Sequence, residues 1–302
     1  MSGSTAGTSF APKALRVTLQ KGRGKFAVGG GNTLTIQAGR RVQFQGLAAQ
    51  GGVDGISQQT AKTRIYGMSS SDMNDLYWAN GGGEFSPPFN TIVVEASGNG
   101  GTTWSTVHKG VVSQAQQDFS GQPDSAFVVE SYGGYDIQLL PVTPGTYKGS
   151  WSIAWILADM AAKGQMTFQD QGVPDIKASD LYFAGALRRQ IEHVCSDYNL
   201  RSEIVGSTLF VWSGTTARKV QVPVIGPESG LISYPVRDAV RCEFQCIYNP
   251  LVRYMGKVTL QSSIKQVAGD WIAVTVQHTL HSETPGGLWQ SDVIAMKTLV
   301  PY

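Results

Sequence analysis

The sequence predicts a mainly β protein with an α+β insertion, in which two antiparallel β-barrel domains flank a small helix-strand-strand repeat domain. Three observations predict this class. Toward both ends of the chain, apolar residues alternate with polar ones, which is the period of a half-buried strand. Turns rich in Gly, Asn and Pro separate these runs. Between the two β regions, the pattern twice changes to the helical period and back.

Residues 1–149 are predicted to form the first β domain. Glycine-rich segments at 29–32 and 98–101 stand between its apolar runs, where tight reversals need positive φ. A short helix is expected at 71–79, with Ser70 or Ser71 as its N-cap. The residue pairs that show the strand alternation are Val17/Leu19, Leu34/Ile36, Val42/Phe44 and Ile92/Val94.

Residues 150–218 are predicted to form the helix-strand-strand repeat domain. Its first helix is expected to start after Ser150 or Ser152 and to end at Gly164, with strands at 166–168 and 173–176. A second helix at 183–197 precedes strands at 201–205 and 208–212. We expect the first helix to turn one apolar stripe into the core: Trp151, Ala154, Trp155, Ala158 and Ala162.

Residues 219–302 are predicted to form the second β domain. Alternation is found at 242–246, 258–260, 272–276 and 293–295. Turns that separate these runs are expected at Asn249-Pro250, Gly269-Asp270 and Pro285-Gly286-Gly287, as in a small antiparallel sandwich or barrel.

The composition favours a component of an assembly. Charged residues make up 15% of the 302 residues, against about 25% in an ordinary soluble domain, and the net charge is only +2. A surface so poor in charge is weakly protected against association. The sequence contains no apolar run of membrane-spanning length, so we expect neither a signal peptide nor stable membrane insertion. It also lacks the basic stripe that is typical of a nucleic-acid binder.

A zinc site built from Cys242, Cys246, His278 and His281 is the sharpest chemical possibility, and strand geometry argues against it. The two cysteines lie about 13 Å apart along a strand, and the two histidines point to opposite faces of theirs. We therefore expect small buried cysteines on a core face and no metal.

No other motif predicts catalysis. The segment 21–25 lacks the ending of a phosphate-binding loop and is interpreted as a basic β-turn. His108 is placed in an exposed strand and His193 on the polar side of a helix, neither beside a nucleophile. We expect no enzyme activity, no catalytic residue and no cofactor, although a meeting of Glu243, Glu283 and Asp292 for glycoside cleavage stays open.

The C-terminal third resembles a known family. The resemblance rests on the segments Pro227–Pro235, Cys242–Pro250, Gly256–Val258, Ser262–Ile264, Gly269–Trp271, His278–Gly287 and Trp289. Together they look like the baseplate hub protein of contractile-tailed bacteriophages. The middle region is similar through its "Leu-Phe-Val-Trp" strand, and the segments 36–42 and 64–66 fit more loosely. The stretch 81–144 matches less well.

The resemblance implies a structural role in a virion. Hubs of this family are homotrimers at the centre of the tail baseplate, with two tail-tube-like domains per subunit, and they adapt a sixfold tail tube to a threefold spike. The implied partners are the central spike, the tail tube or its terminating proteins, and the tape measure protein, with DNA only in transit. Assembly is expected in the host bacterial cytoplasm.

Two polar strand faces are candidates for lining the channel of such a hub, with a solvated outer face as the plain alternative. They comprise Arg41, Gln43 and Gln45 on one strand and Lys257, Thr259, Gln261 and Ser263 on another. Mechanical roles in turns and sheet packing are expected for Asn249, Pro250, Gly256, Trp271, His278, Pro285, Gly286, Gly287 and Trp289.

Three rival functions remain at this stage. The first is a tube or hub component of a phage-related contractile injection system, such as a bacteriocin or secretion device. The second is a hub that also carries a cell-wall hydrolase, for which the 302 residues leave no unassigned segment. The third is a carbohydrate-binding β module, which would be monomeric in solution.

Overall fold

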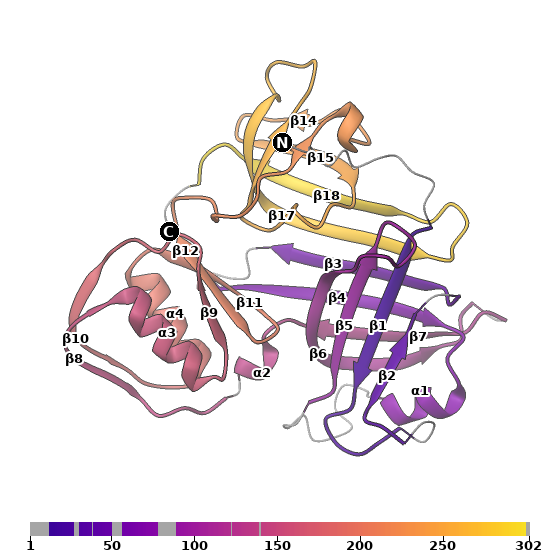
Figure 1. Ribbon diagram of the computed structural model, residues 1–302, viewed down its shortest axis with the longest axis horizontal. Coiled ribbons are helices and arrows are strands. Elements are labelled where there is room, and N and C mark those ends of the chain that lie inside the picture. Colours follow the sequence, from indigo (N-terminus) through magenta and orange to yellow (C-terminus); the bar gives the residue numbers. More distant parts are fainter. Residues whose placement is uncertain are drawn as a thin grey trace.

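A computed structural model of the chain describes residues 12–26, 30–37, 39–49, 56–77, 89–121, 123–138 and 140–299. Three modules lie at the corners of a broad triangle: an N-terminal module of strands β1–β7, a middle module from α2 to β12, and a C-terminal module of strands β13–β18 (Figure 1). Strand accounts for 48% of the structure and helix for 13%. The predicted mainly β class, with an α+β insertion, is confirmed.

The N-terminal module consists of β1 (Ala14–Gln20), β2 (Thr33–Ile36), β3 (Val42–Ala49), β4 (Ile56–Tyr66), β5 (Thr91–Ser97), β6 (Ser105–Asp118) and β7 (Ala126–Tyr132). Its alternating residues behave as predicted, since Val17, Leu19, Ile36 and Phe44 are all buried in one core. Helix α1 spans Ser70–Leu76 and is capped by Ser69 rather than Ser70 or Ser71, because the Ser69 hydroxyl accepts the Asp72 N–H.

The middle module contains α2 (Tyr135–Gln138), β8 (Gly145–Ser152), α3 (Ile153–Lys163), β9 (Thr167–Asp170), β10 (Lys177–Phe183), α4 (Leu187–Asp197), β11 (Leu200–Val205) and β12 (Thr208–Ser213). The order of helix, strand, strand occurs twice, as predicted. The two units are not equivalent, however, because β9 pairs in parallel with β12, whereas β10 pairs with β8 outside the main sheet. The predicted strand at 173–176 falls before β10, and residue 183 ends that strand instead of starting α4.

The predicted core stripe of the first helix is wrong. Helix α3 is capped by Ser152 and closed by Gly164, as expected. The buried side, however, carries Ile153, Ile156, Leu157, Met160 and Ala161. Trp151 and Trp155 are 39% and 46% exposed and stack on one another, with ring centroids 4.3 Å apart. The aliphatic side of α3 is buried because α4 and β9 pack against it, whereas the two indoles lie on another side and cover each other.

The C-terminal module contains β13 (Val224–Ile225), β14 (Val236–Arg237), β15 (Arg241–Ile247), β16 (Lys257–Leu260), β17 (Gly269–Ser282) and β18 (Trp289–Met296). The turn predicted at Gly269-Asp270 is wrong, because these residues are the first two of β17. A bulge between Ala273 and Thr275 also interrupts the alternation in this strand.

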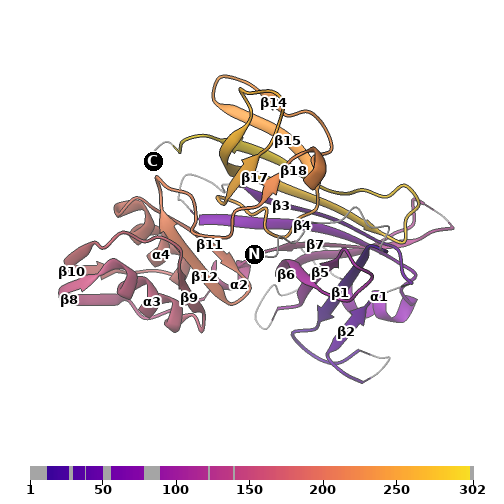
Figure 2. The same cartoon turned by 45° about the horizontal axis from the view of Figure 1, so that its top comes forward.

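The two β modules share one sheet. Its strand order is β14-β15-β18-β17-β3-β4-β7-β6-β5-β1-β2, and β17 pairs antiparallel with β3 from Thr275↔Ala49 to Ser282↔Val42. In both views β3 and β4 run directly beneath the β17–β18 hairpin (Figures 1 and 2). The hairpin also crosses between the cores: Val276 and Val293 pack in the C-terminal core, but Leu280 and Trp289 pack in the N-terminal one. The domain boundaries after residues 149 and 218 stay predictions.

Within the described ranges, none of the helices combines the length and the apolar character needed to cross a membrane.

Candidate functional site

One face of the shared sheet carries polar residues from β15 to β6, and we call it the polar sheet face. The opposite side of the same strands packs into the two cores, through residues such as Phe44 in one core and Phe244 in the other. The alternation of strand side chains therefore sends every second residue outward. The polar sheet face consists of Gln245 on β15, Gln290 and Asp292 on β18, Gln277 on β17, Gln43 and Gln45 on β3, Lys62 and Arg64 on β4, Glu130 on β7, and Gln114, Gln116 and Asp118 on β6.

The strand register places these residues in rows across the strands. In one row, Gln45 lies opposite Lys62, Lys62 opposite Glu130, and Glu130 opposite Gln114. In a neighbouring row, Gln245 lies opposite Asp292 and Asp292 opposite Gln277. Side chains paired directly across strands interact, so the first row is a band of polar groups, whereas the second ends where Gln277 lies opposite Leu47. The face crosses from one β module to the other through Thr279 on β17, which lies opposite Gln45 on β3 and Gln290 on β18.

Both cations on this face are paired with a carboxylate. Lys62 Nζ lies 2.9 Å from Glu130 Oε1, and Arg64 Nη1 lies 3.0 Å from Asp118 Oδ2. Hydrogen bonds from the Ser120 hydroxyl and N–H, together with Arg64, hold the pKa of Asp118 below its usual value, so this carboxylate stays ionised at neutral pH.

Amide groups complete the same face. Gln245 donates to Asp292 Oδ1 at 2.7 Å, and Gln114 donates to Gln116 Oε1 at 3.0 Å. A hollow of about 380 Å³, open to solvent, lies over Gln45, Lys62, Glu130 and Gln277. The surface therefore offers neutral hydrogen-bonding groups and ion pairs.

The structure separates the two predicted channel strands. Gln43 and Gln45 lie on the polar sheet face, and Arg41 stands just before β3, where its guanidinium stacks on Tyr66 and pairs with Asp124. On the other strand, Lys257 and Thr259 belong to β16, whereas Gln261 and Ser263 follow its end.

The two sets lie far apart along β17. Lys257 is opposite Ile272, and Gln43 is opposite His281, nine positions further along the strand. At ~3.3 Å per residue this is about 30 Å. The structure therefore does not bring the two sets together.

The predicted mechanical residues occupy turns and packing positions. Asn249 Oδ1 accepts the Leu251 N–H in the turn that contains Pro250, and Gly256 forms a parallel bridge with Arg218. Trp271 is buried and donates its indole N–H to Val267 O at 2.7 Å. Pro285, Gly286 and Gly287 connect β17 to β18, with Gly286 at positive φ. Trp289 packs edge-on against Tyr248.

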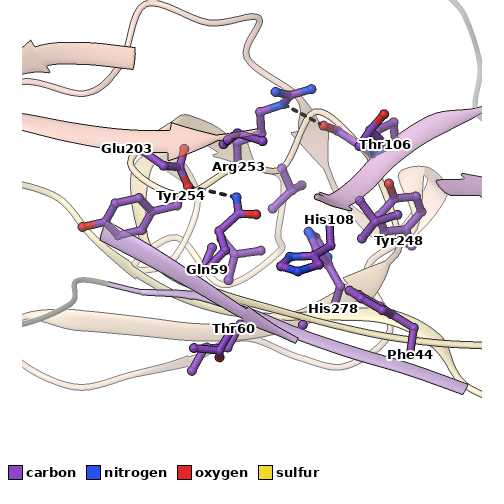
Figure 3. A pocket seen from close by; sticks show the side chains of 18 of the residues that line it. Phe44, Gln59, Thr60, Thr106, His108, Glu203, Tyr248, Arg253, Tyr254 and His278 are labelled. Atoms are coloured by element: carbon purple, nitrogen blue, oxygen red, sulfur yellow. Dashed lines mark hydrogen bonds between the residues drawn. The ribbon is translucent and has the colours of Figure 1, made fainter. Parts of the chain in front are cut away.

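A second candidate site lies where the three modules meet (Figure 3). We call it the junction: a cavity of about 70 Å³ between strands of both β modules and the end of β11. Glu203 and Arg218 form a buried ion pair beside it. The Arg218 guanidinium also donates to Gln171 Oε1 and to Tyr254 O, and Gln59 donates to the Glu203 carboxylate at 3.0 Å. These contacts join all three modules.

Two histidines line the junction, and both are neutral at physiological pH. His108 on β6 bonds the Ser131 hydroxyl at 2.9 Å, and His278 on β17 bonds the Ser291 hydroxyl at 2.7 Å. Burial lowers the pKa of each to about 4, and Arg253 adds to the effect at His278. The expectation of an exposed His108 is wrong, because the middle and C-terminal modules lie over this part of β6 and only 2% of the residue is exposed.

The expected burial of Cys242 and Cys246 is confirmed, since both are fully covered in the C-terminal core. Burial raises the pKa of the Cys246 thiol to about 12. Over the residues that the structure describes, no group of three or more His, Cys, Asp or Glu side chains is arranged to hold a metal ion.

Sequence reasoning missed the residues that carry most of both sites. Lys62 and Arg64 could have been found, because they alternate with Ala61, Thr63 and Ile65 in a clear strand pattern. The pair of Glu203 and Arg218 had no comparable local signal, since its members belong to different segments and meet only in the fold.

Comparisons of the whole chain with known proteins give a consistent answer for the fold. No family model matches it, and no curated protein matches its sequence. The structure is similar to the tail protein from Neisseria meningitidis MC58, with a TM-score of 0.59 and 8% identity over 94% of this chain and 96% of that one. It is also similar to the 43 kDa tail protein of prophage MuSo2 from Shewanella oneidensis, with a TM-score of 0.57 and 7% identity over 95% of this chain and 99% of that one. The chain thus has the fold of these tail proteins from end to end.

Proposed function

We propose that this chain is a non-enzymatic structural subunit of a phage tail, and that it acts as the baseplate hub. Three copies form a ring that connects the tail tube to the central spike, and the polar sheet face lines the channel through which the tape measure protein and then DNA pass. The observation that carries this proposal is one polar face that crosses from one β module to the other, in a chain with the fold of tail proteins.

Two further features support the proposal. The chain has few charges, 24 basic and 22 acidic residues, as suits surfaces that close against neighbouring subunits. Its shared sheet also ends in two edge strands, β14 and β2, and an exposed strand edge is a template for pairing with another chain. A role in a related contractile injection system would use the same structure, and only the neighbouring genes would distinguish the two.

Native mass spectrometry of the full chain, alone and with the spike protein encoded beside it, tests the proposal. We expect a trimer in at least one of the two samples. A strict monomer that binds no spike would contradict it.

The channel lining needs its own test. Gln45→Glu, which faces the hollow, is expected to lower the number of productive infections in the phage that carries it, because three added carboxylates would repel DNA in the ring. Gln169→Glu, at an exposed position of β9 in the middle module, serves as the matched control. Equal infectivity of the two variants would contradict the proposal that the polar sheet face lines the channel.

A further inference from the structure

We infer that the polar sheet face is a passage surface for DNA, on which each cation is neutralised by a carboxylate from another strand of the same sheet so that the duplex is not held. The inference rests on the proposed function, since it assumes that DNA crosses this face. It adds a physical mechanism, which is the removal of electrostatic affinity by cross-strand pairing. It concerns the part of the face formed by β3, β4, β7 and the end of β6.

The charge pattern is the first support. The only basic side chains on β3, β4 and β7 are Lys62 and Arg64, and both stand on the polar sheet face. Each meets a single carboxylate, Glu130 for Lys62 and Asp118 for Arg64. Lys62 lies directly opposite Glu130 on the adjacent strand β7, whereas Arg64 reaches across β7 to Asp118 on β6, so the sheet brings both pairs together.

The small energetic value of these pairs is the second support. The four side chains are between 22% and 46% exposed. Exposed ion pairs contribute only ~0.2–1 kcal/mol to folding, so stability gives little reason for charges at these positions. Their effect on a passing polyanion is larger, because each Lys or Arg that neutralises a phosphate releases counterions and strengthens binding.

The remaining groups on the face are the third support. Gln43, Gln45, Gln114 and Gln116 surround the two pairs and carry no charge at any pH. These amides hydrogen-bond to water and contact phosphates through bridging water molecules. Such contacts break and re-form at a small cost in free energy, so they do not hold the duplex. A duplex in the channel therefore meets a polar surface without an unpaired cation to hold it.

The test is DNA binding by the purified full-length chain, measured by fluorescence anisotropy with a 20-base-pair duplex from 50 to 200 mM salt. Parent protein is expected to bind weakly, with little dependence on salt. The double variant Asp118→Asn, Glu130→Gln exposes two cations per chain. Its affinity is expected to rise and to fall again about tenfold across this salt range, because each phosphate contact contributes a slope of about −0.9 in log K against log salt.

A matched control has the same change in net charge elsewhere. Glu95→Gln with Asp159→Asn releases Arg16 on β1 and Lys163 on α3, both outside the polar sheet face. It is expected to bind DNA as weakly as the parent. Adding Lys62→Gln and Arg64→Gln to the first double variant should abolish the gained affinity, and circular dichroism shows whether each variant is folded.

Three results would overturn the inference: parent protein that binds as tightly as the double variant, a control that gains the same affinity, or a folded double variant that gains none. A folded double variant without gained affinity would indicate that the polar sheet face serves the passage of a polypeptide and not of DNA. These results are separate from the mass measurement, because a monomeric chain would refute the ring whatever its affinity for DNA.

Discussion

Arg218 and Glu203 form an ion pair that is almost completely buried where the three modules meet. Around it, Gln59 comes from the N-terminal module, Gln171 from the middle module and Tyr254 from the C-terminal module. The Arg218 guanidinium also lies over the Phe210 and Trp212 rings, 5.0 and 4.7 Å from their centroids. The side chains of this one pair thus contact residues of all three modules.

Truncation of one partner should therefore be costly. Glu203→Ala or Arg218→Ala is expected to lower the free energy of unfolding by ~3–5 kcal/mol, since each leaves a buried charge without its partner. Urea denaturation measures this loss. The double variant Glu203→Ala, Arg218→Ala should lose less than the sum of the two single variants. Simple additivity would show that the pair is not coupled.

The histidines at the junction predict a dependence of stability on pH. Folding lowers the pKa of His108 from its ordinary 6.5 to about 4. Between these values the unfolded chain binds a proton that the folded chain does not, so stability falls as pH drops from 6.5 toward 4. The loss from this one residue is up to about 3 kcal/mol. Thermal denaturation of His108→Gln should show a smaller loss of stability over this range than the parent.

His193 provides the control for this prediction, because it is exposed on α4. His193→Gln is expected to follow the parent curve. If His108→Gln and His193→Gln show the same pH dependence as the parent, the buried imidazole is not what makes the fold sensitive to acid.

The exposed tryptophans make a prediction about stability. Trp155→Ala is expected to cost about 1 kcal/mol or less, because the side chain is 46% exposed and loses mainly its stacking on Trp151. Trp271→Ala should cost ~3–5 kcal/mol, since that ring is buried and would leave a cavity. Chemical denaturation distinguishes the two. Similar losses in the free energy of unfolding for the two variants would mean that the side of α3 that carries Trp155 is buried.

Gly110 on β6 predicts a steric effect. A Cβ at this position would lie 2.7 Å from the Tyr132 carbonyl oxygen and 2.7 Å from His108 Nε2. Because the Tyr132 oxygen belongs to the backbone of the neighbouring strand, Gly110→Ala is expected to destabilise the fold by ~1–3 kcal/mol. Gly98→Ala is the control, since nothing lies within 4 Å of its Cβ position, and its effect should stay within ~0.5 kcal/mol. Equal melting temperatures would contradict the close packing of β6 on β7.

The sequence predicted the buried residues of strands, which depend on local periodicity. It did not predict which side of α3 is buried, because two sides of that helix fit the same spacing. Val17 and Leu19 were found because a strand with one buried face leaves a unique period-2 signal. Helix α3 carries apolar residues on two sides, and the spacing of three and four fits both. Only the packing of α4 and β9 decides that Ile156, and not Trp155, is buried.

The candidate sites follow the same rule. Gln43 and Gln45 were found on the polar sheet face because they alternate with Val42 and Phe44. Their partners across the strands follow from the register, which one strand's sequence does not contain. The junction was beyond prediction, because Glu203, Arg218 and Gln59 come from three segments that tertiary structure brings together.

The crossing of the β17–β18 hairpin between two cores has a mechanical consequence. Each of its strands is anchored at one end by C-terminal packing and at the other by N-terminal packing, so a load on either β module travels to the other along covalent backbone. Among the residues that the structure describes, the middle module joins the others through smaller contacts: the two-residue pairing of β11 with β4, and a cluster in which Trp212 of β12 packs with Tyr254, Met255 and Ile272. We therefore expect the two β modules to move as one rigid unit, and the middle module to move relative to them at these contacts.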